Sequence, residues 1–247
     1  MPIAPVQSNS IYLHSYTATP PIIDGNLNSF AGEWANAATQ EFDTTIGPSK
    51  HGKIYVMNTQ TDLFIAVEID DAANDGNKDW LQIFFDNDDD GTAEYGDDVL
   101  EVLGDSTFED RFNEADGTND LDTDSSGSND GSGAASYGSG LAFFEMRHPL
   151  KSADPDHDFQ LSFGDIVGFT LRYRDEGTGT ISYWPTTSTS TGSTEGYGDI
   201  GIDPPKNVVG GIYASSDKLS ILAPYIALVG LIGAISTIFA IRIWRKD

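Results

Sequence analysis

Short stretches in which apolar and polar residues alternate set the strongest limit on how this chain can fold. Leu63, Ile65, Val67 and Ile69 share one face of such a stretch. A period of two residues is typical of a β-strand with one buried face. The expected strands are residues 11–14, 42–46, 53–58, 63–69, 81–85, 99–103, 141–147, 169–173 and 181–184. No strong amphipathic helix precedes residue 219, so the pattern predicts an antiparallel, jelly-roll-like β-sandwich.

An acidic stretch directly after one of these strands is the first candidate site. Residues 86–98 hold seven carboxylates in thirteen positions, and alternating aspartates precede Gly91. This D-x-D-x-D-G spacing wraps oxygen ligands around calcium and turns the chain at the glycine, and a cation would relieve the repulsion between the carboxylates. The candidate calcium ligands are Asp86, Asp88, Asp90, Glu94, Asp97 and Asp98. The alternative is a solvated acidic hairpin loop.

A long uncharged segment predicts a membrane anchor. From Leu219 to Ile241 no residue is charged for 23 positions, which is about 34 Å of helix at 1.5 Å per residue. Arg242, Arg245 and Lys246 follow at once, so the positive-inside rule puts the C-terminus in the cytoplasm. We expect a single-pass protein of the cell membrane with an extracellular N-terminal domain. Its parts are an N-terminal extension with the first strand (1–17), the sandwich (18–195), a linker (196–218), the transmembrane helix (219–241) and a cytoplasmic tail (242–247).

The charge and the absence of cysteine limit the partners. The chain has 39 acidic and 13 basic residues, a formal net charge of −26, and no cysteine. Such an acidic surface argues against nucleic acid and anionic lipid headgroups as partners. It suits cations, cationic partners or a salty medium, so net charge alone indicates no site. Disulfides and thiolate metal sites are excluded.

Two further groups of residues are candidate metal ligands. Residues 116–140 are polar and glycine-rich, which predicts a long loop. Within that loop a candidate second calcium site consists of Asp120, Asp122 and Asp124. Imidazole and carboxylate donors later in the chain suit a transition metal. That set consists of His148, Asp154, His157 and Asp158. The alternatives are a flexible loop for the first group and, for the histidines, packing at a strand end and in a polar turn.

Four motifs occur in an informative order along the chain. They are Ile23-Asp24-Gly25 with Glu33-Trp34, a strand from Leu63 to Val67 that runs on to Asp70, Phe84-Phe85-Asp86, and the run from Phe144 to Leu150. Over about residues 18–185 this order resembles family 9 carbohydrate-binding modules, and also the DOMON-like domains related to the ethylbenzene dehydrogenase gamma subunit. The resemblance implies a β-sandwich. The uncharged tail closed by basic residues is similar to those of archaeal surface proteins.

One ligand class that the resemblance implies is carbohydrate. Sugar recognition needs exposed aromatic side chains as stacking platforms with polar groups beside them. The candidate platforms near expected strand ends or loops are Trp80, Tyr95, Trp184 and Tyr197. Each of these aromatic residues could instead serve in packing.

The other implied ligand is b-type haem. Haem-binding members of the superfamily use an early methionine with a later histidine or lysine, and Met57 with His148 or Lys151 is placed comparably. Axial ligation of iron by methionine and histidine is sound chemistry. His148 also departs from the sugar-binding relatives, which usually have an aliphatic residue at that position.

Catalytic motifs are missing from the sequence. There is no G-x-S-x-G, H-E-x-x-H, P-loop or dinucleotide fingerprint. We therefore expect a membrane-anchored, calcium-stabilised extracellular module, not an enzyme, that binds carbohydrate or another ligand, or that scaffolds a surface or membrane complex with other subunits. The alternatives are a haem-binding electron-transfer domain and a catalytic glycan-active protein.

Overall fold

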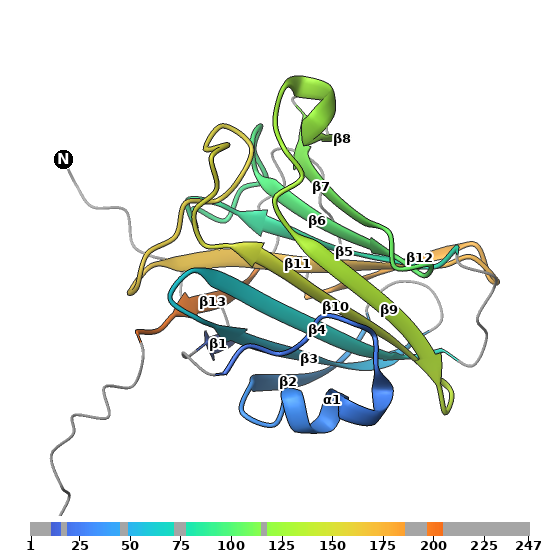
Figure 1. Ribbon diagram of the computed structural model, residues 1–247. Coiled ribbons are helices and arrows are strands. Elements are labelled where there is room, and N and C mark those ends of the chain that lie inside the picture. Colours follow the sequence, from blue (N-terminus) through green and yellow to red (C-terminus); the bar gives the residue numbers. More distant parts are fainter. Residues whose placement is uncertain are drawn as a thin grey trace, which may run out of the picture. The chain divides into compact units, whose positions relative to one another are not determined.

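Two β-sheets stacked face to face form the fold (Figure 1). The structure, a computed structural model, describes residues 11–15, 19–44, 49–71, 78–114, 118–185 and 197–204. The larger sheet has the order β1 (Tyr12–Ser15), β13 (Gly198–Ile202), β11 (Ile166–Asp175), β5 (Trp80–Asp86), β6 (Asp98–Leu103), β7 (Phe108–Asn113) and β8 (Asn119–Leu121), with β12 (Thr180–Trp184) also paired to β11. The smaller sheet has the order β2 (Ala38–Asp43), β3 (His51–Asn58), β4 (Asp62–Asp70), β10 (Leu141–Pro149) and β9 (Ser132–Gly138).

The hydrophobic core lies between the sheets because each strand turns alternate side chains inward. Leu63, Ile65 and Val67 of β4 are buried there, and they meet residues such as Leu81 and Ile83 of β5 from the other sheet. The alternation seen in the sequence is therefore the division between the inward and outward faces of each sheet.

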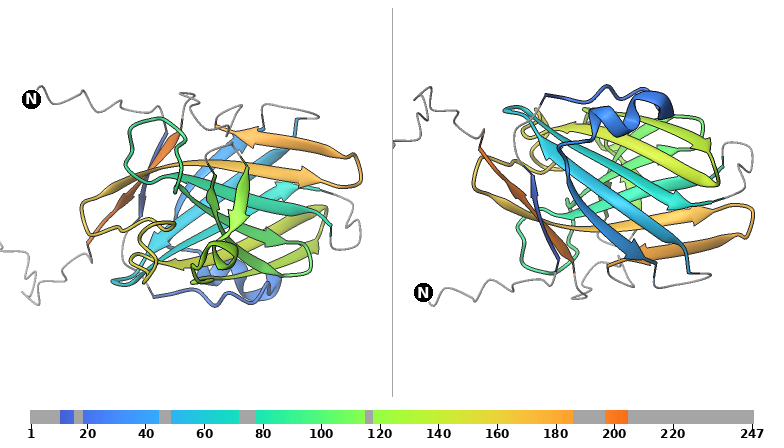
Figure 2. Two further views of the ribbon diagram at one scale, coloured as in Figure 1. Left: turned by 90° about the horizontal axis from the view of Figure 1, so that it is seen from above. Right: turned by 90° about the horizontal axis from the view of Figure 1, so that it is seen from below.

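A short helix covers part of the outward face of the smaller sheet. Helix α1 (Leu27–Glu33) carries Phe30, which packs with Trp34 and with Met57 and Phe64 of the sheet in a second apolar cluster. Figure 2 shows α1 on the outside of this sheet. The Trp34 indole Nε1 donates a hydrogen bond of 2.8 Å to Glu145 of β10. The outward face of the larger sheet has no such helix among the described residues.

The predicted two-sheet β-sandwich is confirmed. Eight of the nine expected strands correspond to β1, β3 to β6 and β10 to β12, and they extend one or more residues beyond the expected bounds, whereas the expected strand 42–46 overlaps β2 only at residues 42 and 43. The neighbouring pairs are antiparallel apart from β1 with β13, which is parallel. The prediction that the acidic stretch leaves a strand is also confirmed, because Asp86 ends β5.

The prediction that residues 116–140 form a long loop is wrong. This stretch contains β8, the 3-10 helix η1 (Asp122–Ser125) and β9, which pairs with β10. Its small residues are needed for close packing. A Cβ at Gly133 would lie 2.3 Å from a methyl carbon of Val102, and one at Gly131 would lie 2.3 Å from the ring of Phe108. Composition alone cannot separate such a closely packed edge strand from a solvated loop.

The larger sheet also extends past the expected domain boundaries. Strand β13 lies in the segment expected to be a linker, and β1 lies in the expected N-terminal extension, yet the two pair with each other. Among the described residues, no helix combines the length and the apolar composition required to cross a membrane. The predicted span from Leu219 to Ile241 and the cytoplasmic tail lie outside the described residues.

Candidate functional site

The outward face of the larger sheet carries a row of polar side chains. The strand register places Arg172 of β11 opposite Gln82 of β5, Gln82 opposite Glu101 of β6, and Glu101 opposite Glu109 of β7. Their strand neighbours, such as Leu81 and Leu171, lie in the core. These polar residues therefore project away from the core.

Aromatic rings lie beside this row. The guanidinium carbon of Arg172 lies 4.7 Å from the ring centre of Trp80 and 5.7 Å from that of Phe84. Burial lowers the pKa of Arg172 from its ordinary value. Its Nε makes no hydrogen bond within the described part of the chain. The stack therefore holds the half-buried Trp80 ring in place, and the Arg172 Nε beside it is a buried donor without a partner among the described residues.

The centre of the row is a hydrogen-bonded set of planar groups. Gln82 Nε2 donates to Glu101 Oε2 over 2.8 Å, and Arg111 Nε lies 2.8 Å from the same oxygen. Burial raises the pKa of Glu101, and Gln82 and Arg111 oppose this shift. Gln82 Oε1 accepts no hydrogen bond from the described residues. Positioned donors and acceptors next to aromatic rings are the usual elements of a small-ligand site.

The predicted sugar platforms separate into two groups. Trp80 lies on the outward face, and Tyr95 is 58% exposed with its ring edge against Phe112. Trp184 is buried, stacked on Phe42 at 4.6 Å, and Tyr197 is buried as well. Sequence reasoning missed the polar partners Arg172, Gln82 and Glu101. Only Arg172 had a signal in the sequence, namely the alternation of Thr170, Arg172 and Arg174 on the polar face of one strand.

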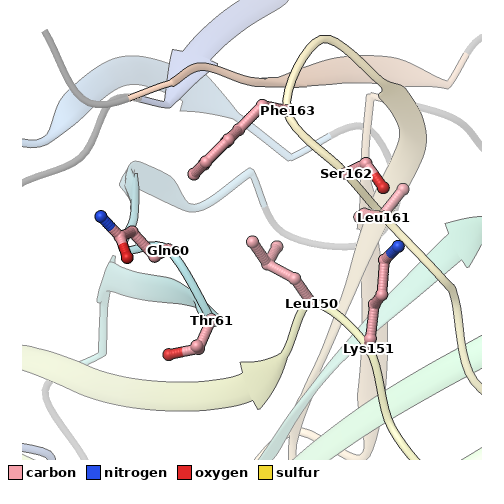
Figure 3. A pocket seen from close by; sticks show the side chains of 7 residues that line it. All are labelled: Gln60, Thr61, Leu150, Lys151, Leu161, Ser162 and Phe163. Carbon is pink, nitrogen blue, oxygen red and sulfur yellow. The ribbon is translucent and has the colours of Figure 1, made fainter. Parts of the chain in front are cut away.

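A separate pocket of about 350 Å³ lies between the β3–β4 turn and the segment after β10 (Figure 3). Leu150, Lys151 and Phe163 line it, together with Gln60 and Thr61 of the turn. Phe163 is 42% exposed. The pocket has one aromatic ring and no carboxylate among its lining residues.

The acidic loop brings its alternating aspartates together. Ligand atoms of Asp86, Asp88 and Asp90 all lie within 4.8 Å of one another. Asp86 is buried and accepts hydrogen bonds from the backbone N–H of Asp90, at 3.3 Å, and of Gly91, at 2.7 Å. Burial, with repulsion from Asp97 and Asp88, raises the pKa of Asp86 to about 7. Such a raised pKa means that burial and nearby negative charge disfavour the ionised carboxylate.

The other predicted calcium ligands lie in different places. Asp97 is buried and accepts the backbone N–H groups of Asn87, at 3.1 Å, and Glu94, at 2.6 Å. Burial raises its pKa to about 6. The Glu94 side chain is exposed. Asp98 belongs to β6 and turns into the sandwich, away from the loop.

One end of the interior between the sheets holds a polar cluster around His148. Its Nε2 lies 3.4 Å from Asp110 Oδ2 and 3.6 Å from Asp158 Oδ2, and its Nδ1 lies 3.9 Å from Asp98 Oδ2. Asp122 of η1 joins Asp110 and Asp158 in a group whose ligand atoms lie within 4.8 Å of one another. Inward-facing positions of β6, β7 and β10 therefore meet the segment after β10 and the short helix.

Several negative charges face a single imidazole in this cluster. Burial by itself would lower the pKa of His148, but Asp98, Asp110 and Asp158 raise it well above its ordinary value. Burial, with repulsion from Asp110 and Asp158, raises the pKa of Asp122 to about 9. Two unit charges 4 Å apart repel by about 4 kcal/mol at an effective dielectric constant of 20. The cluster therefore requires either a proton on a carboxyl group such as Asp122 or a further positive charge.

The predicted transition-metal set is divided between two neighbouring groups. His148 and Asp158 belong to the cluster just described. His157 Nδ1 lies 3.2 Å from Asp154 Oδ2, and these two residues form a group with Asp122. Asp122 was expected to bind calcium with Asp120 and Asp124, but the side chains of those two residues are exposed whereas Asp122 is buried.

The residues expected to ligate haem lie apart. Met57 packs with Trp34 on the outward face of the smaller sheet, whereas His148, opposite the core residue Leu63, is on the inward face. Axial ligands must approach one iron from its two sides. The sheet itself separates Met57 from His148, so the structure does not bring this pair together. Lys151 is exposed at the pocket of Figure 3.

Comparison with known proteins identifies the fold. No protein-family model matches the chain, and no curated protein matches it. The structure is similar to a family 9 carbohydrate-binding module from Caldicellulosiruptor kristjanssonii in complex with cellotriose, with a TM-score of 0.55, 16% identity, and coverage of 79% of this chain and 95% of that one. The same kind of module in complex with glucose gives a TM-score of 0.54, 15% identity, and coverage of 79% and 97%. The structure is also similar to a Bacteroides uniformis protein for which carbohydrate binding is inferred. That comparison gives a TM-score of 0.53 and 9% identity, and it covers 77% of this chain and 98% of that one.

Proposed function

We propose that this chain is a non-catalytic carbohydrate-binding module, and that it binds its ligand on the outward face of the larger sheet. The observation that carries the proposal is the Trp80–Arg172 stack beside the Gln82–Glu101 hydrogen bond. A sugar ring offers an apolar C–H face that can stack on an aromatic ring, and adjacent hydroxyl groups that pair with planar donors and acceptors. The likeness of the fold to modules crystallised with cellotriose and glucose supports this ligand class.

The remaining parts of the proposed function come from the sequence. We propose that the acidic loop binds calcium through Asp86, Asp88 and Asp90, and that the uncharged segment from Leu219 to Ile241 anchors the module on the outer side of a cell membrane. A surface-anchored module with an open binding face would hold glycans close to the cell.

The test is a binding titration of the full chain with oligosaccharides, beginning with cellotriose and glucose and extending to xylan- and mannan-derived oligomers. We expect Trp80→Ala and Arg172→Ala each to weaken binding at least tenfold, which is the loss of about 1.4 kcal/mol. Removing the ring takes away the stacking surface, and removing the guanidinium takes away both the donor and the support of the ring. Isothermal titration calorimetry measures both losses.

A control comes from an exposed aromatic residue at a different place on the molecule. Phe163→Ala removes a ring of the pocket in Figure 3 and should leave the dissociation constant unchanged. Weaker binding by Phe163→Ala together with unchanged binding by Trp80→Ala would move the site to the pocket. Failure of the wild-type chain to bind any oligosaccharide of the panel would contradict the proposed function.

A further inference from the structure

The His148 cluster contains buried polar atoms that no group of the described protein satisfies. Asp98, Asp110, Asp122, His148 and Asp158 are each at most 2% exposed. Both carboxylate oxygens of Asp98, Asp122 and Asp158 and both ring nitrogens of His148 lack a hydrogen bond of acceptable geometry. Buried polar atoms in native proteins are nearly always paired, so each exception requires an explanation. An acidic surface adapted to salt would not explain charges inside the core.

The distances within the cluster suit shared coordination better than hydrogen bonding. His148 Nε2 is 3.4 Å from Asp110 Oδ2 and 3.6 Å from Asp158 Oδ2. Both exceed the 2.7–2.9 Å typical of a charge-assisted N–H to carboxylate bond. Two ligands on a tetrahedral ion with bonds of 2.0–2.1 Å are about 3.3–3.4 Å apart. Both separations from His148 Nε2 are therefore close to those required around one ion.

The donor types select the class of ion. One imidazole nitrogen and several carboxylate oxygens suit zinc and similar first-row ions, whereas calcium takes six to eight oxygen ligands at longer distances. The Oδ2 atom of Asp110 is also held in place, because it accepts the backbone N–H of Asp130 over 2.8 Å.

A further carboxylate lies near the second ring nitrogen of His148, at an ion-pair distance that is longer than a hydrogen bond. Asp98 Oδ2 is 3.9 Å from His148 Nδ1, on the side of the ring away from Asp110 and Asp158. Metal-bound histidines commonly donate their second N–H to a carboxylate that fixes the ring orientation. The ring of Phe159, 4.7 Å from that of His148, contacts the imidazole edge and limits its rotation.

We propose that this cluster binds one divalent transition-metal ion, for which Zn²⁺ is the best match, inside the sandwich. The ligands are His148 through Nε2, Asp110, Asp122 and Asp158, and Asp98 orients the imidazole. They come from both sheets, from η1 and from the segment after β10. The ion joins these four parts of the fold in a chain without cysteine. The proposal is independent of carbohydrate binding on the opposite face of the larger sheet.

The test measures metal content and coordination in the full chain. The purified protein is stripped with a chelator, incubated with Zn²⁺ or Co²⁺, desalted and analysed by mass spectrometry for metals. We expect about one ion per chain, visible d–d absorption bands of a four-coordinate cobalt site without a thiolate charge-transfer band, and a higher unfolding temperature with the ion than without it. A chain that remains folded by circular dichroism and retains less than about a tenth of an ion overturns the proposal.

Variants assign the site. His148→Gln and Asp158→Asn should each weaken zinc binding more than a hundredfold, and Asp98→Asn by 10- to 100-fold. His51→Gln, which changes an exposed histidine paired with Asp43, should bind as the wild type does. Loss of the ion from His157→Gln with full retention by His148→Gln would overturn the assignment.

Discussion

At the scale of single residues, a lysine with a largely covered side chain joins the two sheets. Lys50 precedes β3, and its Nζ lies 2.8 Å from Asp175 at the end of β11 and 3.1 Å from Asp71 after β4. The same ammonium lies 5.4 Å from the ring centre of Tyr173, whose hydroxyl donates to Asp71. One of the few bases in an acidic chain is thus placed where it pairs with carboxylates from both sheets.

Replacing this lysine should make stability depend on pH in a defined way. Lys50→Met leaves Asp71 and Asp175 without their cation, which should cost on the order of 3 kcal/mol near neutral pH. Burial raises the pKa of Asp175, but hydrogen bonds from Lys50 and Thr178 outweigh this and hold it below its ordinary value. A lowered folded-state pKa contributes stability above the unfolded-state pKa, and that stability is lost as pH falls through the folded-state pKa.

The difference in unfolding free energy between wild type and Lys50→Met should therefore shrink below about pH 4. Urea unfolding at a series of pH values measures it. Lys53→Met is the control, because the Lys53 Nζ lies 4.9 Å from the ring centre of Tyr55. This substitution should lower the free energy of unfolding by less than about 1 kcal/mol. A difference that stays constant down to low pH would show that Asp175 does not depend on Lys50.

At the scale of elements, the connection from β5 to β6 is shaped by its own aspartates. Asp86 and Asp97 accept backbone N–H groups of the loop, and Asp89 and Gly91 adopt positive φ angles of 55° and 84°. Across the strand pair, a Cβ at Gly168 would lie 2.9 Å from that of Asp86, so glycine leaves room for this carboxylate. The loop is thereby held in a conformation that gathers negative charge.

Calcium should therefore stabilise the protein through this loop. An ion that binds only the folded state, at a free concentration 100 times its dissociation constant, adds about 2.7 kcal/mol to the free energy of unfolding. We expect calcium to raise the unfolding temperature of the chelator-treated chain, and the double variant Asp88→Asn with Asp90→Asn to abolish the rise. Thermal unfolding across a calcium titration measures it. The control double variant, Asp120→Asn with Asp124→Asn, should show the same calcium-dependent rise in unfolding temperature as the wild type. If only this control lost the rise, the calcium site would lie outside the acidic loop.

At the scale of the whole molecule, the two faces of the larger sheet differ in what they carry. The outward face carries the half-buried Trp80 and Arg172, while the inward face contributes Asp98 and Asp110 to the buried cluster. The smaller sheet instead has part of its outward face covered by α1. The described residues all fall within one compact unit, Met1–Lys206, so the chain beyond it can be removed as a test.

Removing that segment should release the protein from membranes. The full chain should stay in the membrane pellet after washes with high salt and carbonate, because a spanning helix is not released by either wash. Its acidic surface offers no electrostatic attraction to anionic headgroups that could hold the protein there instead. A variant that ends at Lys206 should be found in the soluble fraction. Fractionation followed by immunoblotting measures this. Equal amounts of both proteins in the washed pellet would contradict an anchor between Leu219 and Ile241.

The sequence by itself determined the strands and the acidic loop. Alternation from Leu63 to Ile69 and the spacing of Asp86, Asp88 and Asp90 are local patterns, and a strand or a tight turn forms from neighbouring residues. The two-sheet architecture followed because many such strands with one apolar face can bury those faces only against each other.

Only the tertiary structure decided which distant residues share a site. Asp98 belongs by sequence to the calcium motif, but the pleat of β6 turns it inward, where it meets His148 fifty positions later. Arg172 reaches Trp80 through the register of β11 with β5. Strand parity is visible in a sequence, but the order and register of strands depend on packing across the whole core, which no local pattern contains.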